Sequence, residues 1–134
     1  MLPFSPRLRI ALATAEEIAK GEHRREVTCL DILRGISSLT GGVADGLLKA
    51  RGFSSKVAAV PWYSVNHEPR AYADESLRAL SAAMQDAAGG SRQLIGIEDM
   101  LLGMLSSPST EISRAFGEKN VNVEELISEV RKQM

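Results

Sequence analysis

The sequence contains an internal repeat, in which one stretch recurs at a fixed distance along the chain. This distance, from Val27 to Ile95, is called the repeat offset. Residues 27–37 read V-T-C-L-D-I-L-R-G-I-S and residues 95–105 read I-G-I-E-D-M-L-L-G-M-L, and the two stretches align without a gap. The repeat offset pairs aromatic, aliphatic and turn residues elsewhere: Phe4 with Tyr72, Leu12 with Leu80, Gly21 with Gly89, Leu48 with Phe116, and Gly52 with Asn120. Only two copies fit in the length, whereas an open solenoid needs three or more repeats to build a core. We therefore expect a duplicated unit that packs on itself.

The first half is expected to form four helices, because apolar residues recur at helical spacing between capping residues and glycines. The first helix should begin after the capping hydroxyl of Ser5, with Pro6 at its first position, and the second after Thr28. The remaining predicted helices span Val43 to Ala50, which Gly52 ends, and Ser54 to Val60.

The second half follows the same plan. Asp74 is expected to cap a helix whose buried face carries the apolar residues Leu77, Leu80, Ala83, Met84 and Ala87. Three further helices are expected to open at Gly96, Ser109 and Asn122, with Glu98 and Asp99 favourably placed in the first turn after Gly96. The prediction is eight helices in two groups of four, an all-α fold.

Length, charge and cysteine content narrow the class of protein. A chain of 134 residues is one ordinary domain and needs no disulfide; its single cysteine is Cys29. No apolar run of signal length precedes Phe4, and none approaches the roughly 20 residues that span a bilayer, so we expect a cytoplasmic protein. Sixteen basic and seventeen acidic residues give a net charge of -1, which argues against nucleic acid as a partner. The basic cluster at residues 23–25 is interpreted as a solvated turn.

No group of residues predicts catalysis, a metal or a cofactor. His23 and His67 are far apart in predicted loops, and neither forms a ligand pair with Cys29. The sequence lacks the G-x-x-x-x-G-K-[ST] loop of ATPases. Glu98 and Asp99 are neighbours on a helix and do not face each other, so we interpret them as stabilising a helix start.

These residues resemble the amino-terminal repeat domain of the Clp family of AAA+ protein unfoldases. Each repeat of that domain begins with a pattern like F-T-x-R-A-x-x-x-L-x-x-A, which appears here from Phe4 and more weakly from Tyr72. Its second-helix pattern, V-G-T-E-H-L-L-L-G-L-L, appears best at residues 95–105. The T-E-H triplet is replaced by Cys-Leu-Asp at residues 29–31 and by Ile-Glu-Asp at residues 97–99.

The resemblance implies a domain organisation and a binding surface. Residues 1–134 would form a single domain of two pseudo-symmetric four-helix repeats, at 4–60 and 72–134, with a connector at 61–71. Peptide or adaptor binding would use the groove between the repeats, with these candidate residues: Phe4, Arg9, Leu12, Glu16, Tyr72, Leu80 and Glu98. In ClpC-type members the glutamate that matches Glu98 belongs to a phosphoarginine-binding site. The first repeat has Leu30 there, which cannot accept a charge-assisted hydrogen bond.

The function that the resemblance implies is a non-catalytic module that docks proteins for an ATP-dependent Clp chaperone or protease, as in stress responses. Its partners would be unfolded or tagged substrates, adaptor proteins, and the Clp ATPase ring or peptidase, without nucleic acid or membrane. The alternative is a freestanding accessory or regulatory subunit that binds the Clp ring or the peptidase core. A reading frame continuing into a phosphate-loop ATPase would favour the first, and a stop after Met134 the second. A helical DNA reader would need a basic recognition helix, which the sequence lacks.

Overall fold

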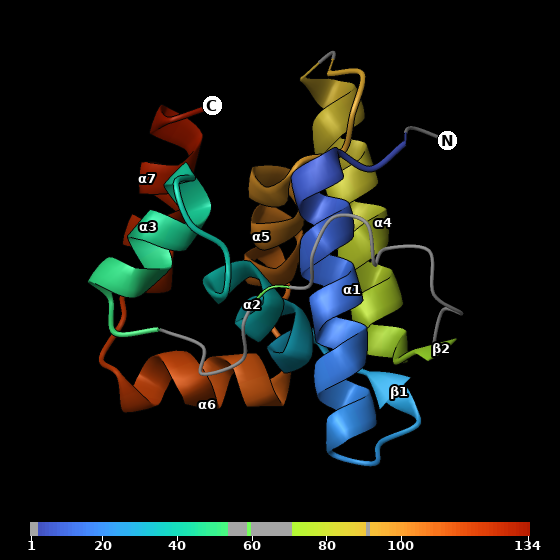
Figure 1. The fold of residues 1–134 in the computed structure, drawn as a ribbon. Coiled ribbons are helices and arrows are strands. Elements are labelled where there is room, and N and C mark those ends of the chain that lie inside the picture. Colours follow the sequence, from blue (N-terminus) through green and yellow to red (C-terminus); the bar gives the residue numbers. More distant parts are fainter. Residues whose placement is uncertain (1–2, 54–58, 60–70, 91) are drawn as a thin grey trace.

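The computed structural model describes residues 3–53, 59, 71–90 and 92–134. Within these residues the chain is almost entirely helical, as Figure 1 shows. The elements are α1 Pro6–Gly21, β1 Glu26–Val27, α2 Cys29–Ser37, α3 Val43–Ala50, β2 Ala71–Tyr72, α4 Asp74–Gly89, α5 Ile97–Ser106, α6 Thr110–Glu118 and α7 Val123–Lys132. The predicted helix at 54–60, except residue 59, and the predicted connector at 61–71, except residue 71, lie outside the described residues. The all-α class with two related halves is confirmed.

Most helices begin where capping chemistry predicts. Hydroxyl oxygens of Ser5, Thr28 and Ser109 accept hydrogen bonds from backbone N–H groups three residues later, at 3.2–3.3 Å. The amide oxygen of Asn122 does the same at 3.1 Å. These bonds satisfy donors that a helix start leaves without partners.

The predicted cap of α4 is wrong by one residue. Ala73, with extended backbone at φ -62° and ψ 153°, occupies the N-cap position, and its side chain makes no capping bond. Asp74 is instead the first helical residue. The chain enters α4 directly from β2, so pairing of the preceding backbone sets the boundary, and the carboxylate of Asp74 interacts favourably with the helix dipole.

Two short parallel pairings tie each repeat to the other, and the sequence did not predict them. Strands β1 and β2 pair Glu26 with Ala71 and Val27 with Tyr72. A separate parallel bridge joins Phe4 to Ile95. The repeat offset maps the Val27–Tyr72 pairing onto the Ile95–Phe4 bridge. The start of each repeat therefore pairs with the residue two positions before the second helix of the other repeat.

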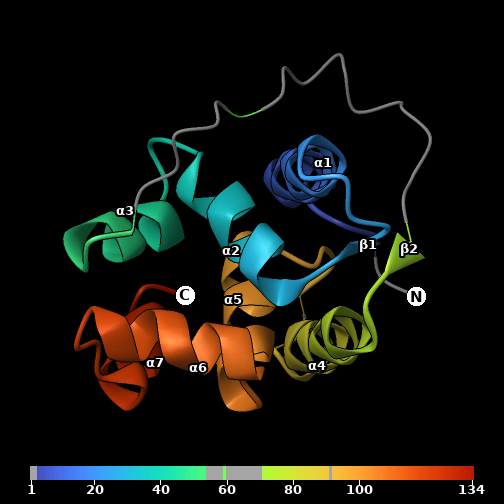
Figure 2. The same cartoon turned by 90° about the horizontal axis from the view of Figure 1, so that it is seen from below.

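The second helix of each repeat packs closely on the first. Figure 2 shows α2 and α5 in the middle of the molecule, with α1 and α4 to one side and α3, α6 and α7 to the other. A Cβ atom on Gly103 would lie 2.5 Å from the carbonyl oxygen of Ala79, and one on Gly35 would clash in the same way with that of Ala11. Glycine at these two equivalent positions therefore permits backbone-to-backbone packing.

The core is continuous across both repeats. The rings of Phe53 and Phe116 meet edge to face, with centroids 4.9 Å apart, and join the end of repeat one to α6. Leu77, predicted on the buried face of α4, is 52 % exposed. Ser76 and Ala79 are buried instead, because small residues allow α4 to approach its neighbours closely. In the part of the chain that the structure describes, no helix is long and apolar enough to cross a membrane.

Candidate functional site

A cavity of about 340 Å³ lies where the starts of α1, α3 and α5 meet. Its lining comes from both repeats and consists of Ser5, Pro6, Arg7, Gly42, Val43, Ala44, Asp45, Gly96, Ile97 and Glu98. The bridge between Phe4 and Ile95 brings these segments together, because Ser5 donates its N–H to the carbonyl oxygen of Ile95 at 2.8 Å. The cross-repeat pairing therefore places the starts of α1 and α5 side by side at the cavity.

Arg7 supplies the positive charge at the edge of this cavity. Its guanidinium lies 3.1 Å from a carboxylate oxygen of Asp45, whose side chain is almost completely buried. Lys49 is 3.8 Å from the other oxygen of Asp45, and the N–H of Gly42 donates to it at 3.4 Å. Asp45 is thus compensated within the fold, while the Arg7 side chain stays 46 % exposed. Arg7 can reach a ligand without leaving a buried carboxylate unpaired.

Glu98 supplies the opposite charge in the cavity. It is half-buried at the second position of α5. The neighbouring Asp99 faces inward and accepts the N–H of Gly96 at 2.9 Å, which caps the helix. No ion pair joins Glu98 to another described residue. Because Glu98 lines the cavity, its carboxylate can meet a cationic or hydrogen-bond-donating group of a ligand there.

The cavity has the chemistry of a binding site, with apolar walls from Pro6, Val43 and Ile97 and two opposite charges at its edge. A few convergent polar groups in an otherwise apolar concavity fix the orientation of a ligand. Among the described residues, no group of three or more His, Cys, Asp or Glu side chains could hold a metal ion; His67 lies outside them.

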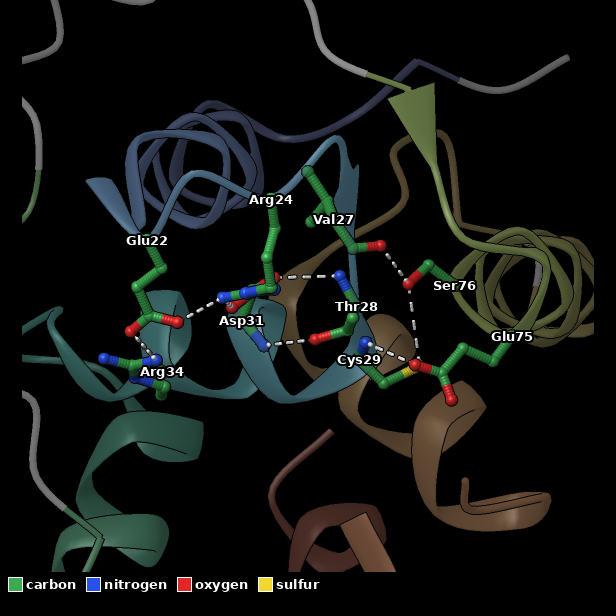
Figure 3. Close-up of polar contacts among 9 residues, drawn as sticks. All are labelled: Glu22, Arg24, Val27, Thr28, Cys29, Asp31, Arg34, Glu75 and Ser76. Carbon is green, nitrogen blue, oxygen red and sulfur yellow. Dashed lines mark hydrogen bonds and ion pairs between the residues drawn. The ribbon is translucent and has the colours of Figure 1, made fainter. Parts of the chain in front are cut away.

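At the position that corresponds to this cavity in the other half, a side chain of the chain itself contacts the helix start. Figure 3 shows it at the start of α2, where the N–H of Cys29 donates to the carboxylate of Glu75 at 3.4 Å. The hydroxyl of Ser76 donates to the carbonyl oxygen of Val27 at 2.8 Å and lies 3.9 Å from the sulfur of Cys29. Burial is the main reason that the pKa of the Cys29 thiol rises to about 11.

In each repeat, an ion pair between an arginine and an aspartate stabilises the start of the second helix. Arg24 bonds both carboxylate oxygens of Asp31 at 2.6 Å, and Arg92 bonds both oxygens of Asp99. Asp31 also caps α2 by accepting the N–H of Thr28 at 2.9 Å. Hydrogen bonding to the carboxylate is the main cause that raises the pKa of each arginine.

The interpretation of residues 23–25 as a solvated turn missed the role of Arg24. Arg24 also bonds Glu22 at 2.6 Å, and Glu22 pairs with Arg34 at 3.0 Å. Hydrogen bonds from these two arginines lower the pKa of Glu22. The repeat offset places Arg24 on Arg92, so the repeat itself contained the signal for this ion pair.

Comparison with solved structures identifies the fold. The N-terminal domain of the caseinolytic protease associated chaperone ClpD from Arabidopsis thaliana superposes with a TM-score of 0.71 at 14 % identity, covering 97 % of this chain and 96 % of that one. The Hsp104 N-terminal domain from Candida albicans gives 0.72 at 15 % identity, covering 96 % and 89 %. A chain from a malarial protein secretion system gives 0.73 at 17 % identity, covering 97 % and 93 %. The chain has the fold of a Clp N-terminal domain.

This likeness lies in the structure. No protein-family model matches the sequence, and the search of curated proteins found no significant match. The share of each chain that is covered shows that the Clp N-terminal fold accounts for nearly the whole molecule.

The Clp N-terminal fold distributes the seven predicted site residues over more than one surface. Glu98 lines the cavity, and Phe4 directly precedes its first residue, Ser5. Leu12 is only 5 % exposed and belongs to the core, while Leu80 packs partly buried against it. Arg9 is exposed on α1. The structure therefore separates Glu98 from the residues that lie along α1 and α4.

Glu16 and Tyr72 are brought together on a different surface. Glu16 is 7 % exposed on α1, and its carboxylate interacts with the hydroxyl of Tyr72 in β2. Burial is the main cause that raises the pKa of Tyr72, and the charge of Glu16 adds to it. This contact joins the first helix of repeat one to the start of repeat two.

Sequence reasoning did not find Arg7, Val43 and Asp45 as cavity residues. Arg7 and Asp45 are 38 positions apart and come together only in the folded chain. The F-T-x-R-like start pointed to the region of Arg7, but no sequence pattern linked α3 to it.

Proposed function

We propose that this chain is a non-catalytic protein-binding module that docks substrate proteins or adaptors for an ATP-dependent Clp-type unfoldase. The observation that carries the proposal is the cavity between the repeats, where Arg7 and Glu98 flank an apolar wall. The structural neighbours with this fold are N-terminal domains of ClpD and Hsp104. Their overall likeness supports the module, and the cavity supports the surface.

The cavity suits a short extended segment of another protein. An apolar side chain of that segment would contact Pro6, Val43 and Ile97. A cationic group would approach Glu98, whose carboxylate has no ion-pair partner among the described residues, and an anionic or carbonyl group would approach Arg7. Such contacts combine apolar affinity with a charged rim that fixes orientation.

A phosphorylated arginine carries both charges on one side chain and is therefore an informative small probe. Its guanidinium would face Glu98, and its phosphate would face Arg7 near the helix starts, where backbone dipoles favour negative charge. The proposal covers protein segments in general, and phosphoarginine is one ligand that the arrangement of charges would accept.

The test is a binding titration in which fluorescence anisotropy reports binding. The probes are a labelled, permanently unfolded protein (reduced and carboxymethylated α-lactalbumin) and free phosphoarginine as its competitor. Glu98→Gln should weaken binding of the unfolded protein at least about tenfold, because a charge-assisted hydrogen bond contributes about 1.5–3 kcal/mol and each factor of ten in affinity is about 1.4 kcal/mol. Glu124→Gln is the matched control, since Glu124 occupies the same second helical position in α7 and is exposed.

Two results would contradict the proposal. One is equal affinity of the Glu98→Gln variant and the unmodified chain for the unfolded protein. The other is no saturable binding of either probe by the unmodified chain. Failure of phosphoarginine alone to compete would remove that ligand and leave the binding of unfolded segments standing.

A further inference from the structure

The fold offers two equivalent positions for a docking cavity, and their chemistry differs. The repeat offset places Arg7 on Glu75, Val43 on Glu111, Ile97 on Cys29 and Glu98 on Leu30. At the first position the charged groups are Arg7, Asp45 and Glu98 around open space. At the second the cation is replaced by a carboxylate, and the acid by an aliphatic side chain.

Glu75 occupies the second position physically as well as in sequence. Its carboxylate accepts the N–H of Cys29 at 3.4 Å from across the repeat boundary. Figure 3 shows this side chain reaching from α4 to the start of α2, beside Ser76 and the Cys29 sulfur. A carboxylate at a helix N-terminus is stabilised by the helix dipole. Glu75 thus sits against the start of α2, where a ligand group would have to sit.

We infer that Glu75 is a built-in occupant of the second docking position, so that one chain takes one ligand segment, at the cavity lined by Arg7 and Glu98. This inference rests on the proposed function of that cavity. An occupant attached to the same chain competes at a high effective concentration. A ligand would have to displace Glu75 and would then find no acid at Leu30.

Electrostatics at the second position also disfavours the ligand that the first accepts. Burial is the main cause that raises the pKa of the Cys29 thiol; the charges of Glu75 and of Glu111, at the start of α6, raise it further, and the charge of Arg78 lowers it. Asp74 adds a third carboxylate in the first turn of α4. An anionic group that Arg7 attracts at the first position would meet more carboxylates than cations near the second, where Arg78 acts against Glu75 and Glu111.

The position of Cys29 allows a test that needs no ligand. Cys29 is the only cysteine and is 3 % exposed. Its alkylation by iodoacetamide, followed by mass spectrometry, should accelerate at least fivefold in Glu75→Ala, because removal of the side chain opens the start of α2. Asp74→Ala removes the same charge one residue away and should leave the rate within twofold. A Glu75→Ala rate equal to that of the unmodified chain would overturn the inference.

Glu75→Gln separates local opening from loss of folding. It keeps the shape and a hydrogen-bond acceptor, so its alkylation rate should lie between those of Glu75→Ala and the unmodified chain. Urea unfolding first measures the free energy of unfolding of each variant. The alkylation rate is then compared with the fraction of unfolded chain that this free energy gives. Acceleration that merely follows the fraction of unfolded chain would contradict a local role for Glu75.

A second experiment tests whether a double variant gains a second binding site. The double variant Glu75→Arg with Leu30→Glu copies the Arg7 and Glu98 pair into the second position. Isothermal titration with free phosphoarginine, or with the unfolded protein if phosphoarginine does not bind, should give one site in the unmodified chain and two in the double variant. Two sites in the unmodified chain, or one in the double variant, would overturn the inference. No binding by the unmodified chain would refute the proposed function, and the alkylation rates would then decide the role of Glu75 alone.

Discussion

Replacing Gly35 or Gly103 by alanine tests whether the two halves share one packing design. Each glycine lies in the second helix of its repeat, where the backbone of the first helix leaves no room for a Cβ atom. On Gly103 that atom would be 2.5 Å from the oxygen of Ala79 and 3.0 Å from the nitrogen of Ala83. On Gly35 the corresponding neighbours are Ala11 and Ala15. The obstacle is backbone in both cases, so a side-chain rotation cannot relieve it.

The expected magnitude follows from two opposing terms. Overpacking a core costs about 1–3 kcal/mol, and a clash with backbone belongs at the upper end, near 3 kcal/mol. Alanine is better than glycine in a helix interior by about 1 kcal/mol. The net loss in the free energy of unfolding should therefore be about 2 kcal/mol for either variant. Gly46→Ala is the control, because nothing lies within 4 Å of its added Cβ; it should gain up to about 1 kcal/mol.

The assay is urea unfolding of the three single variants, monitored by far-UV circular dichroism. The Gly35→Ala and Gly103→Ala variants should lose similar amounts of unfolding free energy, and the Gly46→Ala variant should lose none. A neutral result at either close-packed glycine would refute the close approach of the helices there. A large loss at one and none at the other would refute their equivalence.

Two further predictions concern charged groups. Asp31→Ala and Asp99→Ala should each lower the free energy of unfolding by about 2 kcal/mol, because each removes a helix cap and the carboxylate partner of a part-buried arginine. Urea unfolding measures this loss. A loss under about 0.5 kcal/mol would contradict the prediction. Burial is the main cause that raises the pKa of Asp86 above its ordinary 3.8, with a contribution from Asp99. A raised pKa in the folded state means that Asp86 stabilises the fold at acid pH, and that this contribution is lost as the pH rises through the raised value. Asp86→Asn should therefore weaken the decline of thermal stability with rising pH in this range, and an unchanged pH profile would show that Asp86 is not the group responsible.

The helices could be predicted because each has a local signal of its own. Ser5, Thr28, Ser109 and Asn122 make the capping bonds that their sequence context indicates. The left-handed stop at Gly52, with φ +90°, recurs at the equivalent residue Asn120, with φ +55°. These are interactions between near neighbours in the chain, so the pattern of residues contains them.

The links between the repeats could not be predicted in the same way. Strands β1 and β2 have two residues each, too few for an alternating pattern, and their pairing depends on how the repeats pack. The same pairing moves the start of α4 from the predicted position after Asp74 to the residue after Ala73. Leu77 is exposed although the spacing on α4 predicted burial, because the partner of that helix face is set by tertiary packing.

The candidate site was predictable in part. Glu98 was predicted from the Clp resemblance, and it lines the cavity. The contribution of α3 through Asp45 depends on a contact across 38 positions, which no local pattern reveals. The contrast between Arg7 and Glu75 was present in the sequence at the repeat offset, but its meaning required knowledge of which groups each side chain contacts.

The most direct test of the docking site is a titration of ¹⁵N-labelled chain with the unfolded protein probe, followed by two-dimensional NMR. The amide signals of the residues that line the cavity, at 5, 7, 42–45 and 96–98, should shift or broaden together, while Cys29 and its neighbours at the start of α2 stay unchanged. Perturbations confined to other surfaces, or equal at the two helix starts, would contradict an open docking site at α5 and a filled one at α2.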